Sequence, residues 1–317
     1  MQFDQLKRRE FITLVGGTVA AWPLAARAQQ PLMPVIGLLR STPAKPFAHI
    51  VAALREGLNE IGFVDGHNVV VEQRWADNQL VELPALAADL VRRQAAVIAV
   101  NTPAVDAARG AAANTPIVFV IGGDPVALGF VTSLNRPGGN LTGLTFFGNR
   151  LGAKRLEMLH ELVPGSNIIA ALVDPNFQEA VVESRVLVNA ANEHEFDAAF
   201  TRIVKVGAGA LVVIGSPFFT SKSEMLVALS ARHAIPTIYD LRDYVAAGGL
   251  ISYSPSFTDA YRQAGIYAGR ILKGAKPSEL PVLQPTTFEL AINLKTAKSL
   301  GLTLPSSFYL RADEVIE

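Results

Sequence analysis

The side chains of this chain that could do chemistry follow apolar, strand-like runs. Asn101-Thr102-Pro103 comes directly after one such run and opens a helical pattern. The free N–H groups and the dipole at a helix start suit a ligand carboxylate. Thr102 could instead act only as the cap of that helix, with Pro103 in its first turn. The segment is therefore a candidate anion site, a helix cap, or both.

Further candidates occupy equivalent places after other runs. Gly122-Gly123-Asp124-Pro125 allows a tight turn and a close backbone approach to a ligand, although Asp124 could merely cap the next helix. Ser41 and Thr42 follow the first run. The candidates in the second half of the chain are Asp174, Asn176, Ser216, Pro217, Phe218, Tyr239 and Asp240. An aromatic wall could come from Phe146, Phe147, Phe218, Phe219 and Tyr239, although most phenylalanines are core residues.

The sequence shows no pattern typical of an enzyme or a metal site. No H-E-x-x-H, G-x-S-x-G or phosphate-loop motif occurs, and Gly207-Ala208-Gly209 precedes a strand instead of following one. The chain has no cysteine, which excludes disulfides and thiolate chemistry. Five histidines lie at no metal-ligand spacing: His49, His67, His160, His194 and His233. We expect no catalytic residue, no metal and no cofactor.

The elements that must position these candidates alternate between strand and helix from Met33 onward, which predicts parallel α/β architecture. Strands are expected at 34–39, 69–75, 96–101, 116–122, 168–173, 186–189, 210–214, 236–239, 250–253 and 287–292. Helices are expected at 47–61, 83–93, 103–113, 152–162, 195–205, 221–233, 259–273 and 294–300. Residues 141–147 look like a strand leaving the first block. Ligands of open parallel sheets bind beyond the carboxyl ends of the strands.

Two similar blocks predict two Rossmann-like lobes with a cleft between them. We expect residues 29–143 and 254–284 in the first lobe, and 144–253 and 285–317 in the second. Three connections, near 142–146, 250–254 and 287–292, would form a hinge, and helix 259–273 would pack on the first lobe. Only residues 174–185 separate two strands of the second lobe, about the minimum for a parallel crossover. Either the helix there is shortened or this segment pairs differently.

The first 28 residues predict an export signal. Lys7-Arg8-Arg9 precedes an apolar run of about a dozen residues, and Ala26-Arg27-Ala28 is a small-x-small cleavage site. The arginine pair favours the twin-arginine route, and the run is shorter than the roughly twenty residues of a membrane span. The alternative is an ordinary first helix with a chance arginine pair. We expect a periplasmic protein cleaved after Ala28, without a lipid anchor because no cysteine follows the signal.

The charge balance argues against nucleic acid and membrane partners. The whole chain has 28 basic and 28 acidic residues. Cleavage after Ala28 would remove four basic and two acidic residues and leave a formal charge of −2. Neither a concentrated basic surface for nucleic acid nor a polybasic segment for membranes is visible.

Stretches along nearly the whole chain resemble a bacterial family of ABC transporter substrate-binding proteins. The matching stretches are 8–13, 22–28, 83–91, Gly123-Asp124-Pro125-Val126, 133–140, Pro217-Phe218-Phe219-Thr220-Ser221, 231–236, 288–290 and 293–298. The resemblance implies the type I periplasmic-binding-protein fold and kinship with tryptophan- and tyrosine-binding proteins. The one departure from the family pattern is the short 174–185 segment.

The resemblance also implies a function. It suggests a monomeric receptor that captures an amino-acid-like, including aromatic, small molecule between its lobes and delivers it to an ABC permease. An acid in a water-poor cleft would then pair with the ligand's ammonium, and Asp174 and Asp240 are the candidates. Two alternatives stay open at this stage. One is the effector-sensing domain of a transcription regulator, and the other is a periplasmic enzyme on the same scaffold.

Overall fold

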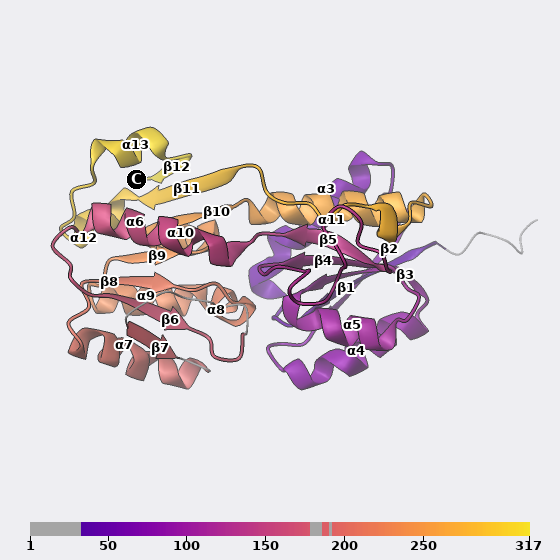
Figure 1. Cartoon of the computed structure of the whole chain (residues 1–317), viewed down its shortest axis with the longest axis horizontal. Coiled ribbons are helices and arrows are strands. Elements are labelled where there is room, and N and C mark those ends of the chain that lie inside the picture. The colour runs from indigo at the N-terminus through magenta and orange to yellow at the C-terminus, as the bar shows by residue number, and fades with distance from the viewer. Residues whose placement is uncertain (1–32, 178–185, 190–191) are drawn as a thin grey trace, which may run out of the picture.

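The computed structural model describes residues 33–177, 186–189 and 192–317, which form two α/β lobes side by side (Figure 1). The predicted export signal at 1–28 and most of the crossover between 174 and 185 lie outside the described residues. Within the described ranges, no helix combines the length and apolar character needed to cross a bilayer.

The first lobe contains a five-stranded parallel sheet in the order β2-β1-β3-β4-β5. Its strands are β1 (Val35–Arg40), β2 (Val70–Trp75), β3 (Ala95–Asn101), β4 (Ile117–Ile121) and β5 (Leu141–Thr145). Its helices include α3 (Ala48–Glu60), α4 (Leu83–Arg92) and α5 (Val105–Ala111). The prediction that residues 141–147 leave this block is wrong for β5, which pairs with β4. Gly143 permits that pairing, because a Cβ there would lie 2.0 Å from the Phe119 carbonyl oxygen.

The second lobe contains a seven-stranded sheet in the order β12-β11-β10-β9-β8-β6-β7. Its strands are β6 (Ile169–Val173), β7 (Val186–Asn189), β8 (Ala210–Val213), β9 (Thr237–Tyr239), β10 (Ile251–Pro255), β11 (Phe288–Asn293) and β12 (Glu314–Ile316). β11 runs antiparallel to β10, so the expectation of a fully parallel sheet fails there. β6 and β7 pair in parallel, so residues 174–185 join parallel strands as a crossover must.

The helices of the second lobe lie on both faces of this sheet. They are α6 (Gly152–Leu162), α7 (Phe196–Lys205), α8 (Pro217–Ser221), α9 (Ser223–Arg232), α10 (Arg242–Ala246), α12 (Leu294–Ser299) and α13 (Ser306–Arg311). One buried cluster joins α7 and α9 to the sheet, and the other joins α6, α12 and α13 to it. The short elements α8, α10, α13 and β12 were not predicted, because each is too short to show a periodic pattern.

The chain crosses between the lobes three times: at 146–148, between β10 and α11 (Phe257–Leu272), and at 284–287. These crossings lie beside the predicted hinge ranges, because 142–146, 250–254 and 287–292 largely form β5, β10 and β11. As predicted for residues 259–273, α11 returns to the first lobe and packs on α3 (Figure 1). Gly57 and Gly265 permit this contact. A Cβ on them would lie 1.8 Å from the Arg262 carbonyl oxygen and 2.1 Å from that of Leu54.

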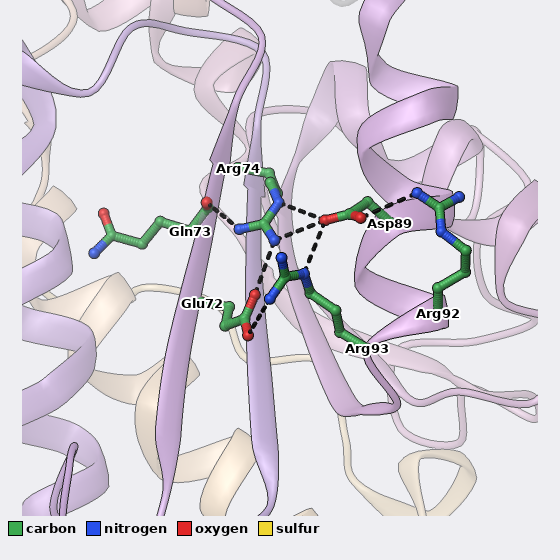
Figure 2. Close-up of polar contacts among 6 residues, drawn as sticks. All are labelled: Glu72, Gln73, Arg74, Asp89, Arg92 and Arg93. Atoms are coloured by element: carbon green, nitrogen blue, oxygen red, sulfur yellow. Dashed lines mark hydrogen bonds and ion pairs between the residues drawn. The ribbon is translucent and has the colours of Figure 1, made fainter.

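An ion-pair network ties the edge strand β2 to α4 (Figure 2). Arg74 donates to Glu72 at 2.8 Å and to Asp89 at 2.7 Å, and Arg93 binds the same two carboxylates. Arg92 adds a third cation at Asp89. The hydrogen bond from Arg74 is the main reason that the pKa of Asp89 is lowered. Charged side chains of this kind protect an edge strand from pairing with another chain.

Candidate functional site

A cavity of about 90 Å³ lies between the lobes, at the carboxyl ends of strands from both sheets. The first lobe lines it with Arg40, Phe47, Asn101, Thr102, Val120, Gly122, Phe146, Phe257 and Tyr261. The second lobe lines it with Phe177, Gly215, Ser216, Pro217, Thr220, Asp240 and Leu241.

Arg40, the last residue of β1, places a buried cation in this cavity. The side chain is 1% exposed, and aromatic rings surround its guanidinium carbon. The ring centroids lie at 4.5 Å for Phe47, 5.2 Å for Tyr261, 5.9 Å for Trp75 and 6.0 Å for Phe257. Aromatic faces attract a cation, more strongly where water is excluded. These four residues form what we call the aromatic cage of Arg40.

The hydrogen bonds of Arg40 leave part of its guanidinium uncommitted. Nε donates to Thr42 Oγ1 at 3.3 Å, and Nη1 donates to the Tyr261 hydroxyl. Among the described residues, no carboxylate lies within the 4 Å of an ion pair. Burial lowers the pKa of Arg40. A guanidinium has five N–H donors in a planar fork that matches a carboxylate, so a ligand carboxylate would suit this site.

Asp240 follows β9 and faces the cavity from the second lobe. Its Oδ1 atom is inaccessible and has no hydrogen-bond partner among the described residues. Burial raises the pKa of Asp240 to about 6, against the opposing charge of Arg155. Gly215, at the end of β8, makes room for the carboxylate, because a Cβ there would lie 2.0 Å from Asp240 Oδ2. A cationic donor in the cavity would relieve the buried oxygen.

Asn101 and Thr102 line the cavity, but not in the predicted capping arrangement. Asn101 occupies the cap position before the 3-10 turn Thr102–Ala104, and no side chain caps that turn or α5. The Asn101 side chain instead binds Ser41, accepting from its N–H at 3.1 Å and donating to its Oγ at 2.8 Å. The prediction that Thr102 caps a helix is therefore wrong, while its place at the cavity wall remains.

Ser216 begins α8 and lines the cavity together with Pro217. Its Oγ accepts a hydrogen bond from the Phe219 N–H at 3.1 Å, and Pro217 occupies the first helical position. Proline suits that position because its missing N–H would be unpaired in any case. The start of the short helix α8 is thus stabilised by Ser216 and Pro217 themselves.

A second, more polar cavity of about 370 Å³ adjoins the first and shares Phe177 and Pro217 with it. Besides Pro217, four of the predicted residues line this polar cavity: Ser41, Asp174, Asn176 and Phe218. Burial raises the pKa of Asp174, whose Oδ1 accepts from the Asn176 N–H at 3.0 Å. Of the two predicted acids, only Asp240 lines the first cavity, which we call the inner cavity.

Three predicted site residues do not line either cavity. Asp124 accepts hydrogen bonds from the N–H groups of Val126 and Ala127 in a turn, and because no helix follows it before β5, the expected helix cap is wrong. Tyr239 is fully buried, stacks on Tyr244 at 4.6 Å and donates to Ser230 Oγ. Thr42 is buried beneath the site and accepts from Arg40. Neighbouring residues of a strand point to opposite faces, so Tyr239 enters the core while Asp240, which follows it, borders the cavity.

Sequence reasoning missed the aromatic cage and Arg40 itself. The position rule that found Asn101 also applies to Arg40, which ends an apolar run. Phe257 and Tyr261 could not be found in this way, because α11 reaches the first lobe only through the second crossing. Of the five proposed wall residues, Phe146 lines the inner cavity and Phe218 the polar one. Phe147, Phe219 and Tyr239 are buried.

Two side-chain contacts join the lobes beside the cavities. Asn78 Nδ2 donates to Ser221 Oγ at 3.2 Å next to the polar cavity. His49 Nε2 lies 3.6 Å from Asp243 Oδ2, in a groove bordered by residues of the second crossing. The structure therefore has its lobes in contact around the inner cavity.

The sequence model of a family described as ABC transporter substrate binding protein matches residues 43–316. The chain belongs to this family. It is 23% identical over 275 residues to a tyrosine-binding protein of Clostridioides difficile strain R20291, covering 82% of this chain and 79% of that protein. The predicted family is confirmed.

Solved structures of similar fold include two that match the whole of their own chains. A conserved domain protein of Vibrio cholerae has a TM-score of 0.81 at 22% identity and covers 90% of this chain. An ABC domain of Streptococcus pneumoniae in complex with L-Trp has a TM-score of 0.77 at 23% identity, with the same coverage. At this identity the likeness shows the fold, and the predicted two-lobed α/β class is confirmed.

Proposed function

We propose that this protein is the extracytoplasmic receptor of an ABC importer and binds an amino acid between its lobes. The observation that carries the proposal is the pair Arg40 and Asp240. Among the residues that the structure describes, one lobe brings a buried cation without a carboxylate partner, and the other brings a carboxylate with an unpaired buried oxygen, to the same cavity. An α-amino acid has both complementary charges, because its ammonium and its carboxylate are attached to the same α-carbon.

The cavity wall favours an apolar or aromatic side chain on that amino acid. Phe146, Phe177 and Phe257 line the cavity together with Val120 and Leu241. Aromatic rings bury large apolar areas and pack edge-to-face or offset against other rings. The names of two relatives, a tyrosine-binding protein and a complex with L-Trp, support this choice of ligand class.

Binding would couple to closure of the lobes. A ligand shifts a conformational balance only through contacts that differ between the two states. An amino acid held by Arg40 and Asp240 touches both lobes, so it favours the closed arrangement, and the closed form would dock on a membrane permease. Release to the far side of the inner membrane after cleavage of the 1–28 signal, and action as a monomer without catalysis, belong to the same proposal.

A thermal-shift screen of the twenty amino acids on the mature protein tests the proposal. Binding to the native state stabilises a protein by about 2.7 kcal/mol at a ligand concentration a hundredfold above Kd. We expect aromatic or large apolar amino acids to raise Tm and to be recovered chemically unchanged. If none of the twenty changes Tm, the proposed ligand class is wrong, and conversion of one of them to a product would indicate an enzyme.

A further inference from the structure

Tyr261 of α11 lines the inner cavity, and its hydroxyl is bonded to Arg40. The residue is fully buried, and its Oη atom accepts a hydrogen bond from Arg40 Nη1. A hydroxyl has one donor besides its acceptor lone pairs, and its hydrogen rotates to suit its surroundings. Among the described residues, no nitrogen or oxygen accepts the proton of this hydroxyl. The donor of Tyr261 is therefore unused beside the buried cation of the site.

The Tyr261 hydroxyl keeps its proton at neutral pH. Burial raises the pKa of Tyr261, against the opposing charge of Arg40. The group is therefore a donor at the pH at which the carboxylate of an amino acid is ionised. A buried donor without a partner costs free energy, so an acceptor that a ligand brings to this position would relieve that cost.

The ring of Tyr261 is held in place by two neighbours. Phe257, one helical turn earlier on α11, contacts it edge-to-face with the ring centroids 5.2 Å apart. The guanidinium carbon of Arg40 lies 5.2 Å from the Tyr261 ring centroid. The close approach of α11 to α3 at Gly57 and Gly265 holds the helix itself. The hydroxyl is therefore in position before a ligand binds, which reduces the entropy lost on binding.

A carboxylate is the acceptor that suits this pair of donors. Arg40 Nε donates to Thr42 and Nη1 to Tyr261, while Nη2 has no partner among the described residues. Each carboxylate oxygen accepts more than one hydrogen bond, so one oxygen can accept from Arg40 and Tyr261 together. A hydrogen bond from a hydroxyl to a carboxylate is shorter and stronger than one between neutral groups. An ammonium has no lone pair to offer and does not fit here.

We propose that Tyr261 is a ligand-binding residue whose hydroxyl donates directly to the ligand's carboxylate, beside the Arg40 guanidinium. This inference rests on the proposed function, because it requires that the carboxylate binds at Arg40. The first lobe then recognises the carboxylate with a charged fork from β1 and a neutral donor from α11. The two groups come from segments that meet only because the chain returns to the first lobe at the second crossing.

The test measures Kd for L-tryptophan and for tryptamine, which has no carboxylate, by titration calorimetry at pH 7. Tyr261→Phe keeps the ring and removes only the hydroxyl. We expect it to weaken L-tryptophan by about tenfold to a hundredfold, as the loss of a hydrogen bond to a charged group does. Its affinity for tryptamine should change little. Equal losses for the two ligands would show a purely structural role and overturn the proposal.

Tyr267→Phe is the matched control on the same helix. The Tyr267 hydroxyl donates to the Pro281 carbonyl oxygen at 2.7 Å, and the residue does not line the inner cavity. Its loss should lower Tm without changing Kd for either ligand. If Tyr267→Phe weakens L-tryptophan as much as Tyr261→Phe does, the effect comes from the stability of α11, and the proposal is wrong.

The Arg40→Met background separates a direct contact from an effect through Arg40. Tyr261→Phe should still weaken L-tryptophan there, by a smaller factor, because the hydroxyl acts on the ligand itself. No further loss would mean that Tyr261 only orients Arg40, which would overturn the proposal. If Arg40→Met binds too weakly to titrate, 3-fluorotyrosine at position 261 decides, because fluorine makes the hydroxyl a stronger donor and a weaker acceptor. Tighter binding would support the proposal, and unchanged or weaker binding would overturn it.

Failure of the proposed function gives a different result. If the unmodified protein does not bind L-tryptophan, or binds tryptamine as tightly, no carboxylate is held in this cavity, and both proposals fall. If the unmodified protein prefers L-tryptophan to tryptamine and Tyr261→Phe keeps that preference in full, only the role of Tyr261 is wrong.

Discussion

The two lobes contribute opposite charges to the cavity and stabilise them in different ways. Arg40 is held inside the first lobe by the aromatic cage and by two hydrogen bonds. Asp240 has a raised pKa, an unpaired oxygen and only a distant counter-ion. The first lobe therefore presents a prepared anion site, whereas the second presents a charge that a ligand would stabilise. The difference suggests that the ligand's carboxylate positions the ligand on the first lobe, and that the ligand's ammonium drives closure of the two lobes.

The largest expected effect is that of Arg40→Met. Truncating one member of a buried charge pair costs about 2–5 kcal/mol of binding free energy, roughly 30-fold to several-thousand-fold in Kd. We expect this loss for L-tryptophan, measured by titration calorimetry at pH 7. Arg40→Lys should recover only part of it, because lysine lacks the bidentate fork. Unchanged affinity in both variants would show that the caged cation is not the carboxylate site.

Asp240→Asn should weaken binding nearly as much but stabilise the unliganded protein. The pKa of Asp240 rises from 3.8 to about 6 on folding, so the native state binds more protons than the unfolded state between these values. Its contribution to stability therefore falls as pH rises through that window and is unfavourable at pH 7. We expect Tm of the unliganded variant to rise by about 2–4 °C at pH 7, as about 1 kcal/mol would produce, and to match the unmodified protein near pH 4. A lower Tm at pH 7 would contradict this account.

Gly215→Ala tests whether the missing side chain at Gly215 provides the space that the Asp240 carboxylate occupies. The new Cβ would overlap Asp240 Oδ2, so the carboxylate must turn away from its present position. We expect about a tenfold loss of affinity, since a misplaced charge loses most of its interaction with the ligand. Gly152→Ala in α6 is the matched control, because beyond its chain neighbours and its own helix backbone no described atom lies within 4 Å of its new Cβ. Equal affinities of the two variants would count against this position of Asp240.

The smallest expected effect concerns the contact between Asn78 and Ser221. Asn78 has φ +66°, which glycine also adopts, so Asn78→Gly removes the side chain without straining the backbone. A double-mutant cycle with Ser221→Ala should give a coupling of about 0.5–1.5 kcal/mol in ligand binding, mainly through faster dissociation. Purely additive losses would mean that this contact does not form on closure.

Much of the fold follows from sequence periodicity, because long apolar runs and helical stripes are local features. The helix predicted at 152–162 has those same limits in the structure, and β7 has the limits predicted for 186–189. The antiparallel pairing of β11 was not predictable in the same way, because it depends on the direction from which the chain returns to the second lobe. The short helices α8 and α10 depend on a single cap or turn.

The site could be predicted only in part, for a related reason. Asn101 ends a strand and Asp240 and Ser216 follow strands, so the position rule for parallel sheets finds them. The same rule also selects Tyr239, whose side chain points into the core. A shift of one residue along a strand turns the side chain to the opposite face, and the rule does not specify positions that closely. Phe257 and Tyr261 reach the cavity from a helix more than 200 residues after Arg40, through a crossing that no local pattern encodes.

The most direct test compares L-tryptophan with two analogues, tryptamine, which lacks the carboxylate, and indole-3-propionate, which lacks the ammonium. Kd is measured for each on the unmodified protein, Arg40→Met and Asp240→Asn. We predict that loss of the carboxylate weakens binding strongly to the unmodified protein but little to Arg40→Met. Loss of the ammonium should weaken binding strongly to the unmodified protein but little to Asp240→Asn. If each analogue loses the same factor on all three proteins, Arg40 and Asp240 do not bind the two charges of the ligand.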